Sequence, residues 1–266
     1  MGLAGRLNSL DLYRQSLGDV PASVWQQTAL EALNLAENGL TSVSEEIGNL
    51  RHLTMLDLGH NELSHLPETL GGLRKLRFLY LSDNRLSAVP RSLWELESLV
   101  YLGLTDNNLA SLPEEIGSLS NLIELRLYNN QLALLPDAIG QLTNLRELHV
   151  MGNHLTSIPE AIGSLAKLRK LMLEGNQIES LPESIAGLKR LTDLDLRNNH
   201  VKHIPDSIGE LEHLRFLDLR ANELTILPRS LSQLHNLGKL DLRWNKSLEI
   251  PEWVTELEQQ GCLVYI

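Results

Sequence analysis

Few side chains in this sequence are spaced for catalysis or metal binding. Asp193 and Asp195 alternate along a predicted strand, so their carboxylates would share one face, as calcium ligation or acid/base chemistry requires. An aspartate recurs at the same spacing at Asp218 and Asp241, which favours a repeated structural position over a site. Cys262 has no histidine set around it to activate the thiol, so a small buried apolar role is favoured over a nucleophile.

The histidines form no recognisable ligand pattern either. Three close pairs exist, namely His60 with His65, His149 with His154, and His200 with His203. None combines with cysteines at the spacing of a zinc site. The Gly71-Gly72 pair is interpreted as a turn and not as a phosphate-binding loop. No group unites a nucleophile, a base and an oxyanion donor, so we predict no catalytic residues, no cofactor and no metal site.

The elements that carry these residues come from an internal repeat. Asparagine recurs every 23 residues within the frame Leu-x-x-Leu-x-Leu-x-x-Asn, at Asn38, Asn61, Asn84, Asn107, Asn130, Asn153, Asn176, Asn199, Asn222 and Asn245. All 10 prolines also share one repeat position, and Ser44 is the only substitute. A fixed period with this frame predicts one short strand and one return segment in each unit.

The frame assigns most of its residues to structure. Leucines at the first, fourth and sixth positions must pack against their equivalents in the next repeat, because one unit is too small to bury its own apolar face. The asparagine side chain can satisfy backbone groups of the turn that would otherwise be buried unpaired. The stretch from Pro113 to Leu119 predicts a short helix or helical turn, with proline at its first position. Trp25 and Trp94 replace a turn glycine and are predicted to pack locally.

The complete unit, seen from Leu99 to Asn121, resembles the intracellular Ras-group leucine-rich repeats of the Shoc and Scribble type, and also bacterial leucine-rich repeat proteins. The resemblance runs from Leu7 to Leu257. It implies an α/β solenoid, namely a right-handed horseshoe with a parallel concave β-sheet and short helices or 3-10 turns on the convex face. It also implies protein binding through the concave sheet.

The repeats predict one elongated domain over residues 1–266. Eleven repeats would extend from about residue 7 to 259, and residues 260–266 would supply a closing strand. The frame departs from its pattern near the ends, with Gln15 in place of asparagine, Ser44 in place of proline, and Ser247 with Leu248 where one leucine is due. These departures affect only the capping geometry.

Composition narrows the class of partner. A formal charge of -11 argues against nucleic acid, which needs a basic footprint, and no apolar run is long enough to cross a bilayer. No leader is recognised at the amino terminus. The single cysteine excludes an intramolecular disulfide and favours a reducing cytosol, so we expect a cytoplasmic location, with secretion or host delivery as the alternative. A monomer is favoured.

The variable repeat positions carry the predicted binding surface. Strand side chains alternate between faces, so the third, fifth and seventh residues of each repeat should point to the concave surface. Both Phe, four of the five Tyr and every Met after the initiator lie in these columns. Such residues suit binding surfaces, whereas strand propensity alone would scatter them along the array. We predict seven apolar anchors in six successive repeats: Met55, Phe78, Tyr80, Tyr101, Tyr128, Met151 and Met172.

A charged pattern follows these anchors. Asp-Leu-Arg occurs three times, and Arg197, Arg220 and Arg243, with Trp244 beside the last, are predicted to form a polar second zone that meets carboxylates of a partner. The alternative is mutual neutralisation of the Asp and Arg rows, at about 0.2 to 1 kcal/mol for each exposed pair. Both can hold at once.

These features predict a noncatalytic protein-protein interaction module or scaffold that acts in signalling and binds a folded domain or an extended peptide. Two alternatives stay open. The chain could be the recognition segment of a larger signalling enzyme or bacterial effector, such as a kinase or ubiquitin ligase. It could also be an exported receptor for glycans or lipopeptides.

Overall fold

The computed structural model describes residues 8–266, and the chain divides into two compact units. Unit 1 contains the residues up to Ala110 together with Ser118–Leu122, and unit 2 contains Ser111–Gly117 and Ile123–Ile266. Leu7, the predicted first core position, lies outside the described residues.

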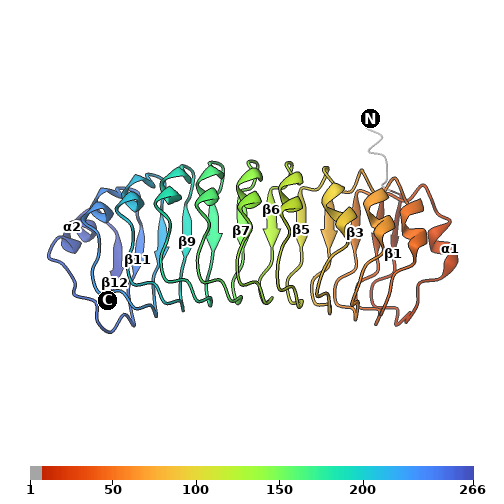
Figure 1. Cartoon of the computed structure of the whole chain (residues 1–266), viewed down its shortest axis with the longest axis horizontal. Coiled ribbons are helices and arrows are strands. Elements are labelled where there is room, and N and C mark those ends of the chain that lie inside the picture. The colour runs from red at the N-terminus through yellow and green to blue at the C-terminus, as the bar shows by residue number, and fades with distance from the viewer. Residues whose placement is uncertain (1–7) are drawn as a thin grey trace, which may run out of the picture. The chain divides into compact units, whose positions relative to one another are not determined.

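Unit 1 pairs its strands in chain order (Figure 1). All the pairings are parallel and offset by one repeat, so that Leu10 faces Leu33 and Leu56 faces Leu79. In the described part of this unit the strands are β1 (Ser9–Asp11), β2 (Ala32–Asn34), β3 (Met55–Asp57), β4 (Phe78–Tyr80) and β5 (Tyr101–Gly103). The return segments hold α1 (Ala22–Trp25) and the 3-10 turns η1 (Glu45–Asn49), η2 (Glu68–Gly72) and η3 (Arg91–Glu95).

Unit 2 repeats the arrangement (Figure 1). Its parallel strands are β6 (Glu124–Arg126), β7 (Glu147–His149), β8 (Lys170–Met172), β9 (Asp193–Asp195), β10 (Phe216–Asp218), β11 (Lys239–Asp241) and β12 (Leu263–Tyr265). The return segments hold η5 (Asp137–Gln141), η6 (Glu160–Ser164), η7 (Glu183–Gly187), η8 (Asp206–Glu210), η9 (Arg229–Gln233) and α2 (Val254–Gln259). The turn η4 (Glu114–Ser118) contains residues of both units.

In each unit strands pack beside strands and 3-10 turns beside 3-10 turns, with the leucine core between them. Leu53, Leu56 and Leu58 are all fully buried, as the frame predicts. Trp25 and Trp94 are also buried, in agreement with local packing. The predicted α/β class, with parallel strands and short 3-10 turns, is confirmed, and β12 lies within the predicted closing segment.

The asparagine of the frame links neighbouring repeats. The Asn61 amide nitrogen donates to the carbonyl oxygens of Leu35, Leu58 and Gly59 at 3.0 to 3.1 Å. Its side-chain oxygen accepts hydrogen bonds from the backbone N–H groups of Asn38 and Leu40, both at 3.0 Å. Because Asn61 is buried, these bonds replace water for backbone groups at the end of the strand.

The repeated proline acts one residue earlier than predicted. It occupies the N-cap of the 3-10 turn, as Pro159 does before η6, and its carbonyl accepts the first bond of the turn from Ile162 N–H at 3.0 Å. The extended backbone of Pro159 (φ -66°, ψ 149°) suits the fixed φ of proline. Ser44 takes this place before η1 and accepts a hydrogen bond from the Glu46 N–H at 3.2 Å, so a side-chain cap replaces the stiff ring.

None of the helices in residues 8–266 combines the length and the apolar character that a membrane crossing requires.

Candidate functional site

Along the strands of each unit, side chains alternate between the buried core and the outward face. In β3, β4 and β6 the middle residue is buried and the two flanking residues are half-buried. The outward side chains, at the third, fifth and seventh repeat positions, form what we call the strand face. Some of them are covered by their neighbours, because Asp195, Asp241 and Thr105 are buried although they occupy outward columns.

The strand face of unit 1 gathers four of the predicted anchors. Met55, Phe78 and Tyr101 are register partners on β3, β4 and β5, and Tyr80 is the next outward residue of β4. All four are half-buried. We call Phe78, Tyr80 and Tyr101 the aromatic cluster.

The aromatic cluster is held in place by local contacts. The rings of Tyr80 and Tyr101 pack with centroids 4.7 Å apart and planes tilted by 35°. Gly103 gives Tyr101 room, because a Cβ at Gly103 would lie only 2.9 Å from the Tyr101 hydroxyl oxygen. The Arg77 guanidinium lies 5.7 Å from the centre of the Phe78 ring, a cation–π distance. The cluster therefore offers ordered aromatic surface with few rotors to freeze on binding.

Unit 2 carries the other three predicted anchors. Tyr128, Met151 and Met172 are half-buried and occupy outward columns. Met172 is the register partner of His149 on one side and Asp195 on the other, so its surroundings are polar. The seven predicted anchors are thus shared between the units, four in unit 1 and three in unit 2.

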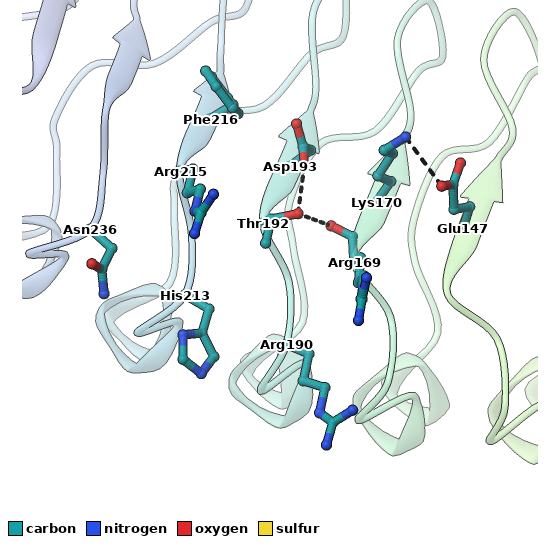
Figure 2. Close-up of a pocket in the computed structure, with 10 residues that line it drawn as sticks. All are labelled: Glu147, Arg169, Lys170, Arg190, Thr192, Asp193, His213, Arg215, Phe216 and Asn236. Carbon is teal, nitrogen blue, oxygen red and sulfur yellow. Dashed lines mark hydrogen bonds and ion pairs between the residues drawn. The ribbon is translucent and has the colours of Figure 1, made fainter.

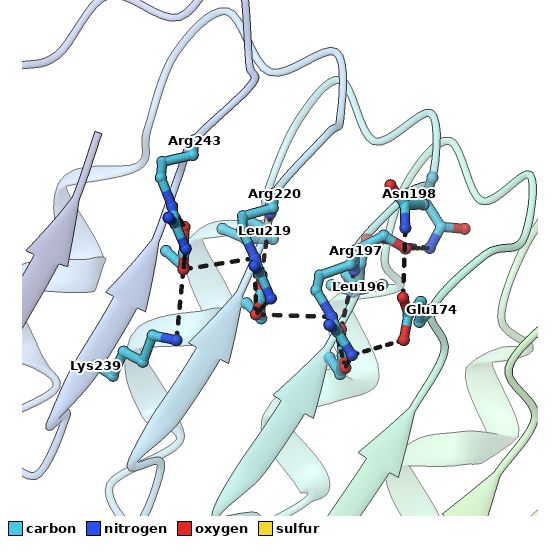
Figure 3. A network of polar contacts seen from close by, with 12 residues as sticks. Glu174, Leu196, Arg197, Asn198, Leu219, Arg220, Lys239 and Arg243 are labelled. Atoms are coloured by element: carbon cyan, nitrogen blue, oxygen red, sulfur yellow. Dashed lines mark hydrogen bonds and ion pairs between the residues drawn. The ribbon is translucent and has the colours of Figure 1, made fainter.

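The three Asp-Leu-Arg segments form a charged ladder on unit 2 (Figure 3). We use the name Asp–Arg ladder for Asp195, Arg197, Asp218, Arg220, Asp241 and Arg243. Each arginine binds the aspartate of its own repeat through two nitrogens, as Arg243 does with Asp241 at 2.7 and 2.8 Å. Arg197 and Arg220 also approach the aspartate of the following repeat, at 3.7 and 3.5 Å. Glu174 and Lys239 close the two ends, at 2.6 Å from Arg197 and 3.4 Å from Asp241.

The ladder neutralises itself. The aspartates raise the pKa of Arg197, Arg220 and Arg243, chiefly through side-chain hydrogen bonds. Burial alone would raise the pKa of Asp241, but the hydrogen bond from Arg243 and the nearby arginine charges lower it overall. Mutual neutralisation therefore describes these side chains as they stand, and the contact of the three arginines with a partner stays a prediction.

Aromatic side chains near the carboxyl end are more exposed than the predicted anchors. Trp244 is 67% exposed, Phe216 49% and Tyr265 40%. The Arg243 guanidinium lies 5.1 Å from the Tyr265 ring and 5.9 Å from the Trp244 ring. Phe216 was not among the predicted anchors, although it occupies the third column, because it lies outside the six successive repeats that defined them.

Glu124, Glu147 and His149 form the group of side chains in residues 8–266 with the proximity of metal ligands, since their ligand atoms lie within 4.8 Å of one another. Sequence spacing could not reveal this group, because its members come from adjacent strands. Each carboxylate already has a cation: Glu124 pairs with Arg126 at 2.5 Å and Glu147 with Lys170 at 3.1 Å. Burial opposes ionisation of Glu147, but hydrogen bonds from His149 and Lys170 lower its pKa. These contacts account for the group as an ion-pair cluster.

The remaining chemical candidates have structural partners. Asp193 accepts a hydrogen bond from the Thr192 hydroxyl at 2.6 Å, and Asp195 belongs to the Asp–Arg ladder. Cys262 is buried, and desolvation raises the pKa of its thiol to about 11, so the thiol is protonated at neutral pH.

An open hollow of about 700 Å³ lies at the start of the strands of unit 2 and was not predicted (Figure 2). It is lined by Arg169, Arg190, Arg215 and His213, beside Phe216. Arg169 and Arg215 occupy the second repeat position, and Arg146 does so one repeat earlier. The second column of the repeat carries this signal in the sequence, whereas the predicted binding surface rests on the third, fifth and seventh columns.

Comparison with known proteins agrees with the geometry. Family models described as leucine rich repeat match residues 5–63, 28–86, 143–201 and 189–246, and one described as a leucine-rich repeat region matches residues 88–168. A search of curated proteins finds no significant match.

Solved structures provide similar folds. A leucine-rich repeat protein of Leptospira interrogans is 25% identical, with a TM-score of 0.64, and the match covers 98% of this chain and 96% of that one. The plant peptide hormone receptor RGFR1, solved in complex with RGF2, is 31% identical over 85% of this chain and 38% of the receptor chain (TM-score 0.77). A chain in the octameric complex of Latrophilin 3, Unc5D and the leucine-rich repeats of FLRT2 is 27% identical, with a TM-score of 0.79. The match covers 99% of this chain and 85% of that one. Since the family models together span most of the sequence, the chain belongs to the leucine-rich repeat family.

Proposed function

We propose that this chain is a noncatalytic protein-interaction module that binds a protein partner on its strand face. The aromatic cluster of unit 1 is the observation that carries the proposal. Phe78, Tyr80 and Tyr101 are scarce residue types placed together on adjacent strands, where they are half-buried and ordered by one another.

The physical argument rests on what aromatic side chains contribute to interfaces. They bury a large area at a small cost in side-chain entropy, and tyrosine adds a hydroxyl that can bind polar groups at the rim. Met55 extends the cluster on β3 with a side chain that adapts its shape to a partner. In unit 2, Tyr128, Met151 and Met172 offer similar side chains, and we propose them as partner contacts of that unit.

A polar second zone on unit 2 completes the proposal. Trp244 is its most exposed member, and Arg197, Arg220 and Arg243 lie in the Asp–Arg ladder. Because the aspartates already engage the arginines, a partner carboxylate would have to share or displace an existing pair. We therefore expect this zone to set orientation and specificity more than affinity.

The structural neighbours support a binding role. The plant receptor RGFR1 was solved with RGF2, and the FLRT2 repeats were solved with Latrophilin 3 and Unc5D. We infer by analogy a protein or peptide partner and a role in signalling or scaffolding. The formal charge of -11 supports the view that nucleic acid is not the partner.

The test compares the intact chain with the variant Phe78→Ala/Tyr80→Ala/Tyr101→Ala. Proteins captured from native lysate by the intact chain are identified, and the purified partner is then titrated against both forms. Loss of this many central aromatic contacts should weaken binding by about a hundredfold or more, since hot-spot residues each contribute about 2 kcal/mol or more. Tyr80→Ala/Tyr101→Ala alone should already weaken it clearly.

The matched control removes exposed apolar residues elsewhere. Leu134 and Ile226 share one repeat position and are 56% and 60% exposed, so Leu134→Ala/Ile226→Ala should leave affinity unchanged. Circular dichroism and thermal melts verify that each variant folds. Equal affinity of the folded triple variant and the intact chain would rule out the aromatic cluster as the contact surface.

The cellular location does not follow from the fold and is part of our proposal. The single buried cysteine is compatible with a reducing cytosol, and we propose a cytoplasmic location and a monomer. The two alternatives, a recognition segment of a larger enzyme or effector and an exported receptor for glycans or lipopeptides, predict different partners. Identification of the captured protein, together with a glycan and lipopeptide array, separates them.

A further inference from the structure

An open hollow in unit 2 collects cations that have no acidic partner. Of the arginines that line it, Arg169, Arg190 and Arg215 make no ion pair with any of residues 8–266, and all three are exposed. Figure 2 shows Arg169 and Arg215 just before β8 and β10, and Arg190 and His213 in the turns that lead into β9 and β10. The hollow measures about 700 Å³.

The two carboxylates that line this hollow make contacts within their own unit. Glu147 pairs with Lys170 at 3.1 Å and with His149 at 3.1 Å. Asp193 accepts the Thr192 hydroxyl at 2.6 Å. Asp193 keeps its negative charge, but Arg169, Lys170, Arg190 and Arg215 outnumber the carboxylates of Glu147 and Asp193 in the lining. The hollow is therefore a locally positive surface on a protein whose formal charge is -11. Guanidinium groups bind carboxylates through two parallel hydrogen bonds, so carboxylates are suitable occupants.

The length of the hollow suits an extended ligand. Its lining runs from Glu147 on β7 to Asn236 before β11, which is four strand spacings or about 19 Å at about 4.8 Å each. An extended chain advances about 3.3 Å per residue, so about six residues span it. Arg169 and Arg215 are two repeats apart, about 10 Å between their backbones, so separate carboxylates of one extended segment can contact them. Phe216, 49% exposed, adds an apolar contact at the same place.

We propose that this hollow binds an acidic segment, rich in aspartate or glutamate and extended over about six residues, of the protein partner. The inference rests on the proposed function, because it names a second contact of the same module. It assigns Arg169, Arg190 and Arg215 to carboxylates of the segment and Phe216 to an apolar side chain within it.

The test uses a fluorescent hexaglutamate peptide titrated against the full chain, with hexaglutamine as the uncharged counterpart. At an ionic strength of about 0.1 M, charges beyond about 10 Å are screened, so the local arginines dominate over the distant negative charge. We expect hexaglutamate to bind, hexaglutamine not to bind, and affinity to fall as salt rises. The variant Arg169→Gln/Arg190→Gln/Arg215→Gln should lose about tenfold or more in affinity.

A charge-matched variant removes three exposed cations outside the hollow, in Arg51→Gln/Arg91→Gln/Lys246→Gln. It should bind hexaglutamate within about twofold of the intact chain, because distant charges are screened. Equal loss in both variants would show attraction by overall charge and overturn the proposal, as would no binding of hexaglutamate. Competition by inorganic phosphate as strong as that of the peptide, or tighter binding of a single-stranded oligonucleotide, would overturn the assignment to an acidic polypeptide.

The peptide titration is independent of the aromatic cluster. The variant Phe78→Ala/Tyr80→Ala/Tyr101→Ala should keep hexaglutamate binding while it loses the partner. Failure of the hollow alone would leave the partner-binding proposal standing. Failure of the aromatic variant alone would leave the acidic-segment site standing.

Discussion

Asp241 is the most heavily used carboxylate of the Asp–Arg ladder. It is fully buried and lies 2.7 Å from Arg243, 3.4 Å from Lys239 and 3.5 Å from Arg220. A buried carboxylate with several cations is stabilised only while all of them stay in place. Asp241 is therefore expected to contribute more to stability than the other aspartates of the ladder. In the sequence, the three aspartates occupy equivalent repeat positions.

We expect Asp241→Asn to lower the free energy of unfolding by about 3 kcal/mol, because the neutral amide leaves Arg243 and Lys239 without their carboxylate partner. Urea denaturation at neutral pH measures the change. The pKa of Asp241 is lowered in the folded protein, so its contribution is present above its unfolded-state pKa and is lost as pH falls through the folded-state value. The deficit of the variant should therefore shrink under acid conditions below about pH 3.8.

Asp137→Asn provides the control for this experiment. Asp137 is exposed in the first turn of η5, so its replacement should change stability by less than about 0.5 kcal/mol. If Asp241→Asn proved as mild as the control, the ladder would be a set of solvent-screened surface pairs.

Among the elements of the repeat, the turn that follows each strand has a distinctive backbone conformation. The eighth residue of the repeat adopts a left-handed backbone, with φ of 54° at Asn198, 67° at Gly175 and 51° at Ala221. This conformation turns the chain out of the strand just before the asparagine that recurs every 23 residues. Asparagine and glycine tolerate it, whereas alanine carries a Cβ that crowds the next carbonyl.

Replacing Ala221 by glycine should stabilise the protein by about 0.5 to 1 kcal/mol, because relief of the left-handed strain exceeds the added entropy of the unfolded chain. Thermal unfolding measures the shift. Ala166→Gly is the matched change at an exposed turn residue that has no positive φ, and it should destabilise slightly. A loss of stability in Ala221→Gly equal to that in Ala166→Gly would contradict the argument from backbone strain.

At the scale of the whole molecule, charge is distributed unevenly. The formal charge is -11, yet unit 2 holds the row of unpaired arginines at its hollow. Long-range approach of a polyanion is governed by the total charge, whereas short-range contact is governed by the local one. An acidic peptide that forms part of a larger partner can use the local field once other contacts bring it close.

We expect no binding of labelled duplex DNA in a gel-shift or polarisation titration at about 0.15 M salt. A duplex is longer than the row of arginines, so most of its phosphates would face a protein with a net negative charge. Hexaglutamate in the same buffer serves as the comparison. A dissociation constant for DNA below about 10 µM, within the non-specific range of DNA-binding proteins, would contradict this expectation.

The architecture follows from the repeat frame alone. The 23-residue period placed Leu56 and Leu79 in the core and Phe78 and Tyr101 on the outward face, because strand alternation and the parallel register follow from the repeat. It also identified the three Asp-Leu-Arg segments. These results come from backbone geometry, which each repeat specifies in the same way.

The contacts between side chains became visible only in the folded protein. The structure showed that buried Asp241 pairs with cations from two repeats, that Glu124, Glu147 and His149 meet across strands, and that Arg169 keeps no acidic partner among residues 8–266. Repeat spacing gives the column of a residue but not its rotamer. Pairing between charges depends on rotamers and on neighbours about 4.8 Å away in the next strand, and these are set when the repeats stack.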